Sequence, residues 1–368
     1  MANPATAAPA RLAYERWTDP AAGDLLAAEP GIEVHHLDLT GPAERSWGTL
    51  GRAHGYHAAI RTVCAQVPDG DQWLAGRHLV ERCPELLAVA TAGAGYDVVD
   101  VDACTEAGIV VCHNSGPGAE AVAEHALAMM LALAKKLVLA DRTMRSGAVR
   151  DRSPLRGTEL LAKTLGVVGL GAIGSRLVEL CAPFRMTVLA HDPYVDRAHA
   201  ASLGAELVDL DELLDRADVV QATCPLTPET TGLFGRDAFV KMRPSAFFVT
   251  TARGEVHDEH ALLDALDGGQ IAGAGLDVFH TEPVDPDHPL LARDDVVASP
   301  HTAGITAEAA HGLAVAAARQ WLTVFAGRIP PGLVNPAAWP RYQDRFHAAF
   351  GIRPDDLPRP ADPPRGAR

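Results

Sequence analysis

The chain has 368 residues, of which 48% are apolar, 21% charged and 5% aromatic, and its formal charge is −15. At roughly 150 residues per domain this length indicates about two domains, and the apolar content excludes global disorder. The net negative charge repels phosphate backbones, which argues against a general nucleic-acid-binding protein.

The sequence predicts a cytoplasmic protein. The N-terminus lacks the apolar segment of a signal peptide, and the most apolar helical stretch, residues 126–134, is far shorter than the roughly twenty residues of a membrane span. Six scattered cysteines without a CxxC pair predict buried, reduced thiols. They are Cys64, Cys83, Cys104, Cys112, Cys181 and Cys224.

In chain order, short β-branched runs alternate with helical segments, which predicts an α/β fold with parallel sheets. Both ends, residues 1–10 and 353–368, are predicted to be disordered because they contain few large apolar residues. A single long helix is predicted from about Gly118 to Ser146, and a final apolar helix from about 307 to 326. Strands are predicted at 32–35, 58–61, 86–90, 164–168, 187–191, 219–222, 246–250, 273–276 and 296–299.

The most specific local pattern is a glycine-rich turn, Gly169-x-Gly171-x-x-Gly174, between a predicted strand and a predicted helix. In a dinucleotide-binding fold the first glycine permits a tight turn and the second lets the backbone reach the pyrophosphate. The third allows the helix to pack closely on the strand. The alternative for this pattern taken alone is an ordinary glycine-rich turn.

The next predicted strand ends in Asp192, eighteen positions after Gly174. A carboxylate about twenty residues after the glycines accepts hydrogen bonds from the ribose hydroxyls and repels a 2′-phosphate, so the pattern favours NAD over NADP. The alternative is that Asp192 only opens the turn with Pro193. We expect two Rossmann-like, doubly wound domains: an NAD-binding domain at 113–304, and a discontinuous substrate-binding domain at 11–112 and 305–340.

Further polar residues follow predicted strands: Arg253, Asp277, Glu282 and His301. The carboxyl ends of parallel strands meet at one edge of a sheet, so these side chains are expected to converge there. Each also has a structural interpretation. Arg253 could form a surface ion pair, Asp277 or Glu282 a turn, and His301 a cap.

Five motifs in this order resemble the D-isomer-specific 2-hydroxyacid dehydrogenase family over about residues 55–340. They are TAGAGYD (91–97), GLGAIG (169–174), TARG (251–254), GLDVFHTEP (275–283) and SPHTAG (299–304). The resemblance implies a homodimer built on the NAD-binding domains and a catalytic trio of Arg253, Glu282 and His301. It also implies that backbone amides of Gly93, Ala94 and Gly95 receive the substrate carboxylate, for which a plain tight turn is the alternative. The implied cofactor-binding residues are Gly169, Gly171, Ala172, Ile173, Gly174, Asp192, Cys224, Pro225, Thr230, Thr251, Ala252, Arg253, Asp277, His301, Ala303 and Gly304.

The expected chemistry is reduction of a 2-keto acid. Histidine titrates near neutrality, so His301 is the natural proton donor to the carbonyl oxygen, and Glu282 would stabilise and orient its ring. Arg253 would hold the substrate carboxylate through its planar guanidinium, and Asp277 would accept from the nicotinamide carboxamide. Arg61 is expected to contact the distal group of the substrate, with a surface arginine as the alternative.

Other functions stay open at this stage. A phosphoglycerate dehydrogenase proper or a phosphite-oxidising enzyme would use the same scaffold, whereas formate dehydrogenases carry Gln where this chain has Glu282. A different class is an NADH-sensing, corepressor-like binding module. No metal site is expected, because the cluster at 257–260 opens a helix with Asp258 as its N-cap. The substrate's identity and the favoured direction of reaction are not encoded in these patterns.

Overall fold

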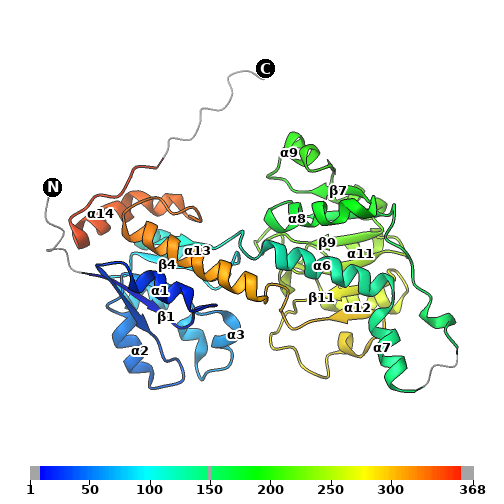
Figure 1. Ribbon diagram of the computed structural model, residues 1–368, viewed down its shortest axis with the longest axis horizontal. Helices are drawn as coiled ribbons and strands as arrows, with labels where there is room; N and C mark the ends of the chain where they lie inside the picture. The colour runs from blue at the N-terminus through cyan, green and yellow to red at the C-terminus, as the bar shows by residue number, and fades with distance from the viewer. Residues whose placement is uncertain (1–8, 148–150, 358–368) are drawn as a thin grey trace. The chain divides into compact units, whose positions relative to one another are not determined.

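The computed structural model describes residues 9–147 and 151–357. The chain divides into two compact units, each built on one sheet (Figure 1). Unit 1 comprises residues up to Ser115 and from His311 onward, and unit 2 comprises Gly116–Ala310. The described helices are all too short or too polar to cross a membrane.

Unit 1 contains a five-stranded parallel sheet in the order β2-β1-β3-β4-β5. Its strands are β1 (Ala10–Tyr14), β2 (Ile32–His36), β3 (Gly55–His57), β4 (Ala88–Ala90) and β5 (Val110–Cys112). Its helices are α1 (Ala21–Ala27), α2 (Ala43–Leu50), α3 (Arg61–Cys64), α4 (Arg77–Arg82), α5 (Val101–Ala107), most of α13 (Ala307–Phe325) and α14 (Trp339–Phe350). Successive residues of a strand point to opposite faces of the sheet and belong to different apolar cores. In β5, Val110 belongs to one core and Val111 to the other, so helices cover both faces.

Unit 2 contains a seven-stranded parallel sheet in the order β12-β11-β10-β9-β6-β7-β8, the dinucleotide-binding order with one added strand. The strands are β6 (Thr164–Val168), β7 (Thr187–His191), β8 (Ala205–Leu207), β9 (Val219–Ala222), β10 (Phe247–Thr250), β11 (Gly273–Leu276) and β12 (Val296–Ala298). The helices are α6 (Ala119–Ala134), α7 (Leu137–Arg145), α8 (Ala172–Cys181), α9 (Arg197–Ser202), α10 (Leu210–Arg216), α11 (Arg236–Lys241) and α12 (Glu259–Asp267). The predicted α/β fold with two parallel-sheet domains is thus confirmed.

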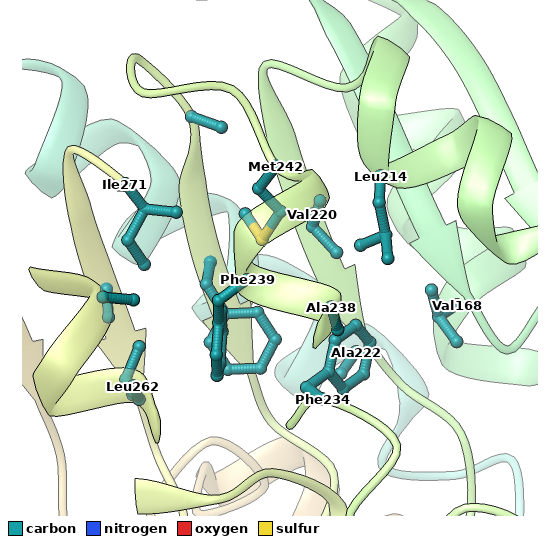
Figure 2. Packing of buried hydrophobic residues seen from close by; sticks show 14 of the residues in the cluster. Val168, Leu214, Val220, Ala222, Phe234, Ala238, Phe239, Met242, Leu262 and Ile271 are labelled. Atoms are coloured by element: carbon teal, nitrogen blue, oxygen red, sulfur yellow. The ribbon is translucent and has the colours of Figure 1, made fainter. Parts of the chain in front are cut away.

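The sheet of unit 2 separates two apolar cores. On one face, where α10, α11 and α12 lie, Phe248 packs with Phe234 and Phe239. Figure 2 shows Phe234 and Phe239 in this core, together with Leu214 and Leu262. The neighbouring Val249 faces the opposite core with α6 and α8. Burial on both faces explains why this strand is a continuous apolar run and not an alternating one.

Several predicted elements need correction. The strand expected at 58–61 is wrong: β3 ends at His57, and Arg61 begins α3. The strands β1, β5 and β8 were not predicted. Residues 1–8 and 358–368 of the predicted disordered ends lie outside the described chain. By contrast, Ala10 pairs with Ile32, and residues 354–356 accept hydrogen bonds from Trp339 and Gln343 of α14.

The single helix predicted at 118–146 is also wrong, because the helix is interrupted between α6 and α7. Lys136 adopts a left-handed conformation, with φ of 50°. The carbonyl of Ala134 accepts the Thr158 N–H at 2.7 Å, so a loop from elsewhere in unit 2 takes the place of the next helical turn. Apolar periodicity does not reveal this break, since α7 continues with Leu137 and Val138.

The break at Lys136 predicts opposite effects of glycine at two adjacent positions. Lys136→Gly should be more stable than Lys136→Ala by about 1 kcal/mol, since left-handed backbone is costly for residues with a Cβ. At Lys135, whose φ is −94°, Ala should be at least as stable as Gly. Urea unfolding measures the free energy of unfolding of the four variants. Because Gly and Ala at one position both lack the lysine side chain, their difference reports the backbone alone. A lower stability of Lys136→Gly than of Lys136→Ala would contradict the break.

Candidate active site

The predicted site residues of unit 2 follow the carboxyl ends of its parallel strands. Gly169–Gly174 follow β6, Asp192 follows β7 and Cys224–Thr230 follow β9. Thr251–Arg253 follow β10, while Asp277 and Glu282 follow β11. His301, Ala303 and Gly304 follow β12. All therefore lie at one edge of the sheet, where ligands bind in open parallel sheets.

The glycine turn has the geometry of a pyrophosphate cradle. Gly169 has φ of +97°, and a Cβ on it would lie 2.6 Å from the backbone nitrogen of Cys224. A Cβ on Gly174 would lie 2.2 Å from the carbonyl oxygen of Gly169, so α8 packs tightly against the turn. Gly171 lies before Ala172 and Ile173 of the first turn of α8, and a Cβ on it would meet no atom within 4 Å. Its side-chain position is open space, as close approach of a phosphate requires.

Neighbouring residues hold this turn in place. The Thr223 hydroxyl donates to the Gly169 carbonyl at 2.6 Å, and the Leu170 N–H donates to Asp192 Oδ2 at 2.9 Å. Asp192 Oδ1 also accepts the Tyr194 N–H. Asp192 therefore ties the glycine turn to the end of β7, and each of its oxygens keeps a further lone pair. Thr223 was not predicted, because a threonine before the CPLT stretch carries no signal of its own.

The loop after β9 is also fixed locally. The Thr230 hydroxyl donates to the Pro225 carbonyl at 2.6 Å and accepts the Thr227 N–H at 2.8 Å. Burial raises the pKa of the Cys224 thiol to about 11, which makes it an unreactive packing residue at neutral pH. Each of the six cysteines is buried, and none forms a disulfide. Their burial confirms that part of the sequence prediction.

His301 and Glu282 form the central pair of the site. His301 Nδ1 lies 2.7 Å from Glu282 Oε2, and Glu282 Oε1 accepts the Phe279 N–H at 3.1 Å. Because Nδ1 is engaged, Nε2 is the ring nitrogen left for proton exchange, and the side chain is 38% exposed. Burial alone would raise the pKa of the Glu282 carboxyl. The hydrogen bond and charge of His301, the Phe279 N–H and the charge of Arg253 bring this pKa below its ordinary value of 4.5.

Arg253 is held by an unusually close approach of two loops. A Cβ on the next residue, Gly254, would lie 2.1 Å from the carbonyl carbon of Phe279, so only glycine fits there. The Arg253 guanidinium donates to the Ala252 carbonyl at 2.7 Å. His280 adds a second link between these loops, since its Nε2 lies 2.7 Å from the carbonyl oxygen of His257. The loop carrying Arg253 and the loop carrying Glu282 are thereby joined.

Asp277 anchors the turn that carries His301. Its Oδ1 accepts the Thr302 N–H at 2.8 Å and the Ser299 hydroxyl at 2.6 Å, and its Oδ2 accepts the Ala303 N–H at 3.0 Å. The side chain is 1% exposed. His301 itself has φ of 55°, an uncommon conformation for a residue with a Cβ, and its N–H donates to the Asp277 carbonyl. The predicted contact of Asp277 with the nicotinamide stays a prediction.

The predicted substrate residues Arg61, Gly93, Ala94 and Gly95 belong to unit 1, where they follow β3 and β4. Arg61 donates to the Asp97 carbonyl at 3.3 Å, and the same nitrogen lies 3.5 Å from Asp97 Oδ2, so it is tied to the segment 91–97. The carbonyl of Gly93 accepts the Asn114 N–H and the Thr91 hydroxyl. Asn114 thus helps to fix this glycine-rich turn, a role that no sequence pattern around it indicates.

The histidines at 257 and 260 do not form a metal centre with their neighbours. Asp258 accepts the N–H groups of His260 and Ala261 and is the N-cap of α12, as predicted. Over residues 9–147 and 151–357, no group of three or more His, Cys, Asp or Glu side chains is arranged to hold a metal ion.

The pair of Glu282 and His301 predicts how stability depends on pH. A carboxyl whose pKa is lower in the folded than in the unfolded state stabilises the fold when it is ionised. Relative to Glu282→Gln, the Glu282 contribution should be complete above about pH 4.5, the ordinary value, and disappear as the pH falls through the lowered folded-state pKa. Urea unfolding of both proteins at stepwise lower pH measures it. If the stability difference between the unsubstituted protein and Glu282→Gln stayed constant or grew as the pH fell, the lowered pKa of Glu282 would be refuted.

Comparison with known proteins places the chain in a family. Residues 127–303 match the family model for the D-isomer specific 2-hydroxyacid dehydrogenase, NAD binding domain. A D-3-phosphoglycerate dehydrogenase of Mycobacterium tuberculosis H37Rv is 40% identical over 311 residues, which cover 80% of this chain. They cover only 58% of that relative, so the chain spans little more than half of its length.

Two further relatives are matched over more of their length. A glyoxylate reductase of Thermofilum pendens is 39% identical over 264 residues, covering 70% of this chain and 77% of the relative. The structure of D-lactate dehydrogenase from Aquifex aeolicus, complexed with NAD and lactic acid, has 27% identity and a TM-score of 0.71. That match covers 86% of this chain and 96% of the other. This chain therefore belongs to the D-isomer specific 2-hydroxyacid dehydrogenase family.

Proposed function

We propose that this protein is an NAD-dependent oxidoreductase that interconverts a small 2-keto acid and the corresponding D-2-hydroxy acid. The observation that carries the proposal is the His301–Glu282 pair, joined to the Arg253 loop through Gly254 at the same sheet edge as the glycine turn. Membership in the family, with its NAD binding domain, supports the same activity. NAD as the cofactor is supported by Asp192, whose negative charge disfavours a 2′-phosphate at the end of β7.

The residues of the chain supply the acid-base chemistry. Bound NADH supplies the hydride that reduces C2 of the keto acid. His301 Nε2 gives its proton to the carbonyl oxygen, so the products are the hydroxy acid and NAD⁺, and the reverse reaction returns the proton to Nε2. Glu282 stabilises the positive ring before transfer and fixes its orientation through Nδ1. Arg253 holds the substrate carboxylate with paired N–H donors.

The substrate carboxylate is also assigned to the backbone amides of Gly93, Ala94 and Gly95. A Cβ on Gly93 would meet no atom within 4 Å, which leaves room for an anion close to the backbone. Arg61 is the candidate for the distal group of the substrate. Its link to Asp97 places it beside the segment that is proposed to bind the carboxylate.

A homodimer through unit 2 belongs to this proposal. The helix α7 buries none of its residues, and Leu137 and Met144 are 63% and 69% exposed. A cavity of about 560 Å³ lies beside α7, and its lining includes Leu139, Leu160 and Phe247. It lies at the amino ends of the strands, whereas the candidate active site lies at their carboxyl ends. Such apolar surface is typical of a covered interface. Sedimentation as a single 38.8 kDa chain would contradict the dimer.

The activity is tested with a panel of 2-keto acids, each with NADH and with NADPH. The panel contains glyoxylate, hydroxypyruvate, phosphohydroxypyruvate, pyruvate and 2-oxoglutarate. At least one acid should be reduced, faster with NADH, and His301→Ala should lower kcat by a factor of about 10² to 10⁴, as expected for loss of a general acid. NADH affinity, followed by fluorescence, should be unchanged in this variant. Phosphite is included as a competing substrate.

The outcomes separate the competing functions. Reduction of phosphohydroxypyruvate in preference to the other acids would identify a phosphoglycerate dehydrogenase, and that preference should weaken in Arg61→Ala. Tight NADH binding without turnover of any acid would favour the NADH-sensing binding module. Full activity of His301→Ala would overturn the proposed proton donor.

A further inference from the structure

A histidine lies on the apolar face of α6 that packs on the sheet of unit 2. Val122, Met129 and Leu133 of this face lie against glycines: a Cβ on Gly304 would be 3.7 Å from Val122, and one on Gly275 3.2 Å from Met129. Leu133 would meet a Cβ on Gly273 at 3.4 Å. The glycines of β11 let α6 approach closely. His125 occupies the same helical face, three residues after Val122 and four before Met129.

His125 reaches the anchor of the catalytic turn through one hydroxyl. Its Nε2 lies 2.8 Å from Ser299 Oγ and 3.7 Å from Asp277 Oδ1. Ser299 donates its only hydroxyl hydrogen to Asp277 at 2.6 Å, so its oxygen can only accept from His125. This assigns a proton to His125 Nε2. The chain of donors therefore runs from His125 to Ser299 and on to Asp277.

We infer that His125 is a positioning residue for the reaction, acting through Ser299 and Asp277 on the turn that carries His301. Asp277 accepts the backbone N–H groups of Thr302 and Ala303, directly after His301. With its hydroxyl oriented by His125, Ser299 presents its hydrogen to the carboxylate in one direction. The carboxylate then holds the left-handed backbone at His301, and Nε2 keeps the direction in which it transfers the proton.

This inference rests on the proposed function for its kinetic consequence but not for its structural one. Removing the donor leaves the Ser299 hydroxyl free to turn away from a buried carboxylate. Loss of the hydrogen bond from His125 to the Ser299 hydroxyl corresponds to a decrease in kcat of about tenfold. The KM of the keto acid should change little, because the chain of donors from His125 ends at Asp277 and the turn after it, whereas substrate binding is assigned to Arg253 and the segment 91–97.

The test compares His125→Ala, His125→Gln and Glu124→Ala. Gln keeps an N–H donor and should restore most of kcat, whereas Ala should lose about tenfold at an unchanged melting temperature. Glu124 is an exposed neighbour on α6, and its replacement should leave kcat unchanged. The double variant His125→Ala, Ser299→Ala should lose no more kcat than the more damaging of the two single variants, because both substitutions interrupt the same chain of donors.

Hydrogen–deuterium exchange supplies a readout that does not depend on turnover. In His125→Ala the peptide containing Thr302 and Ala303 should take up deuterium faster, and in His125→Gln and Glu124→Ala it should match the unsubstituted protein. If no keto acid is reduced by the unsubstituted protein, the proposed function fails while this measurement still decides the network. Unchanged uptake in His125→Ala, a lower melting temperature that Gln does not rescue, or additive kinetic losses with Ser299→Ala would each overturn the inference.

Discussion

The candidate site depends on one buried carboxylate. Asp277 accepts two backbone N–H groups and one hydroxyl, and these hydrogen bonds hold the turn from Ser299 to Ala303 at the end of β12. A side chain that is almost fully buried must find partners for its oxygens, so the turn and the carboxylate stabilise each other. His301 is thereby held in a conformation that a residue with a Cβ rarely adopts, with its ring against Glu282. Strain at one residue is here balanced by several neighbouring hydrogen bonds.

Close approaches between backbones bring the remaining groups to the same edge of the sheet. Gly254 lies against the backbone of Phe279, and Gly169 against that of Cys224, at distances that no Cβ permits. Each contact joins loops from two different strands. The parallel sheet thus supplies the common edge, and the glycines determine how closely its loops can approach there. On the face of the sheet that α6 covers, the glycines of β11 likewise let the helix approach closely.

Strong local patterns could be predicted from the sequence. The glycine turn, the six strands predicted in unit 2 and the N-cap at Asp258 follow from residues that are close together in the chain. Weak local patterns failed. Gly55–His57 has little strand character because Gly55 is required where Trp321 packs, and its would-be Cβ lies 2.5 Å from that ring. The break at Lys136 depends on Thr158, over twenty residues away, and periodicity contains no trace of it.

The amino-acid sequence by itself determined the α/β class, six of the seven strands of unit 2 and the dinucleotide turn. Its family motifs predicted Arg253, Glu282 and His301 as the residues of proton transfer and substrate binding. Those features depend on residue type and spacing over short segments, where local backbone preferences act. Only the tertiary structure decided that Asp277 anchors a turn, that Thr223 holds Gly169, and that His125 joins Ser299 across 174 positions of the chain. A hydrogen bond requires a donor and an acceptor within about 3 Å, and for residues so far apart in sequence that distance is set by the packing of helices on a sheet.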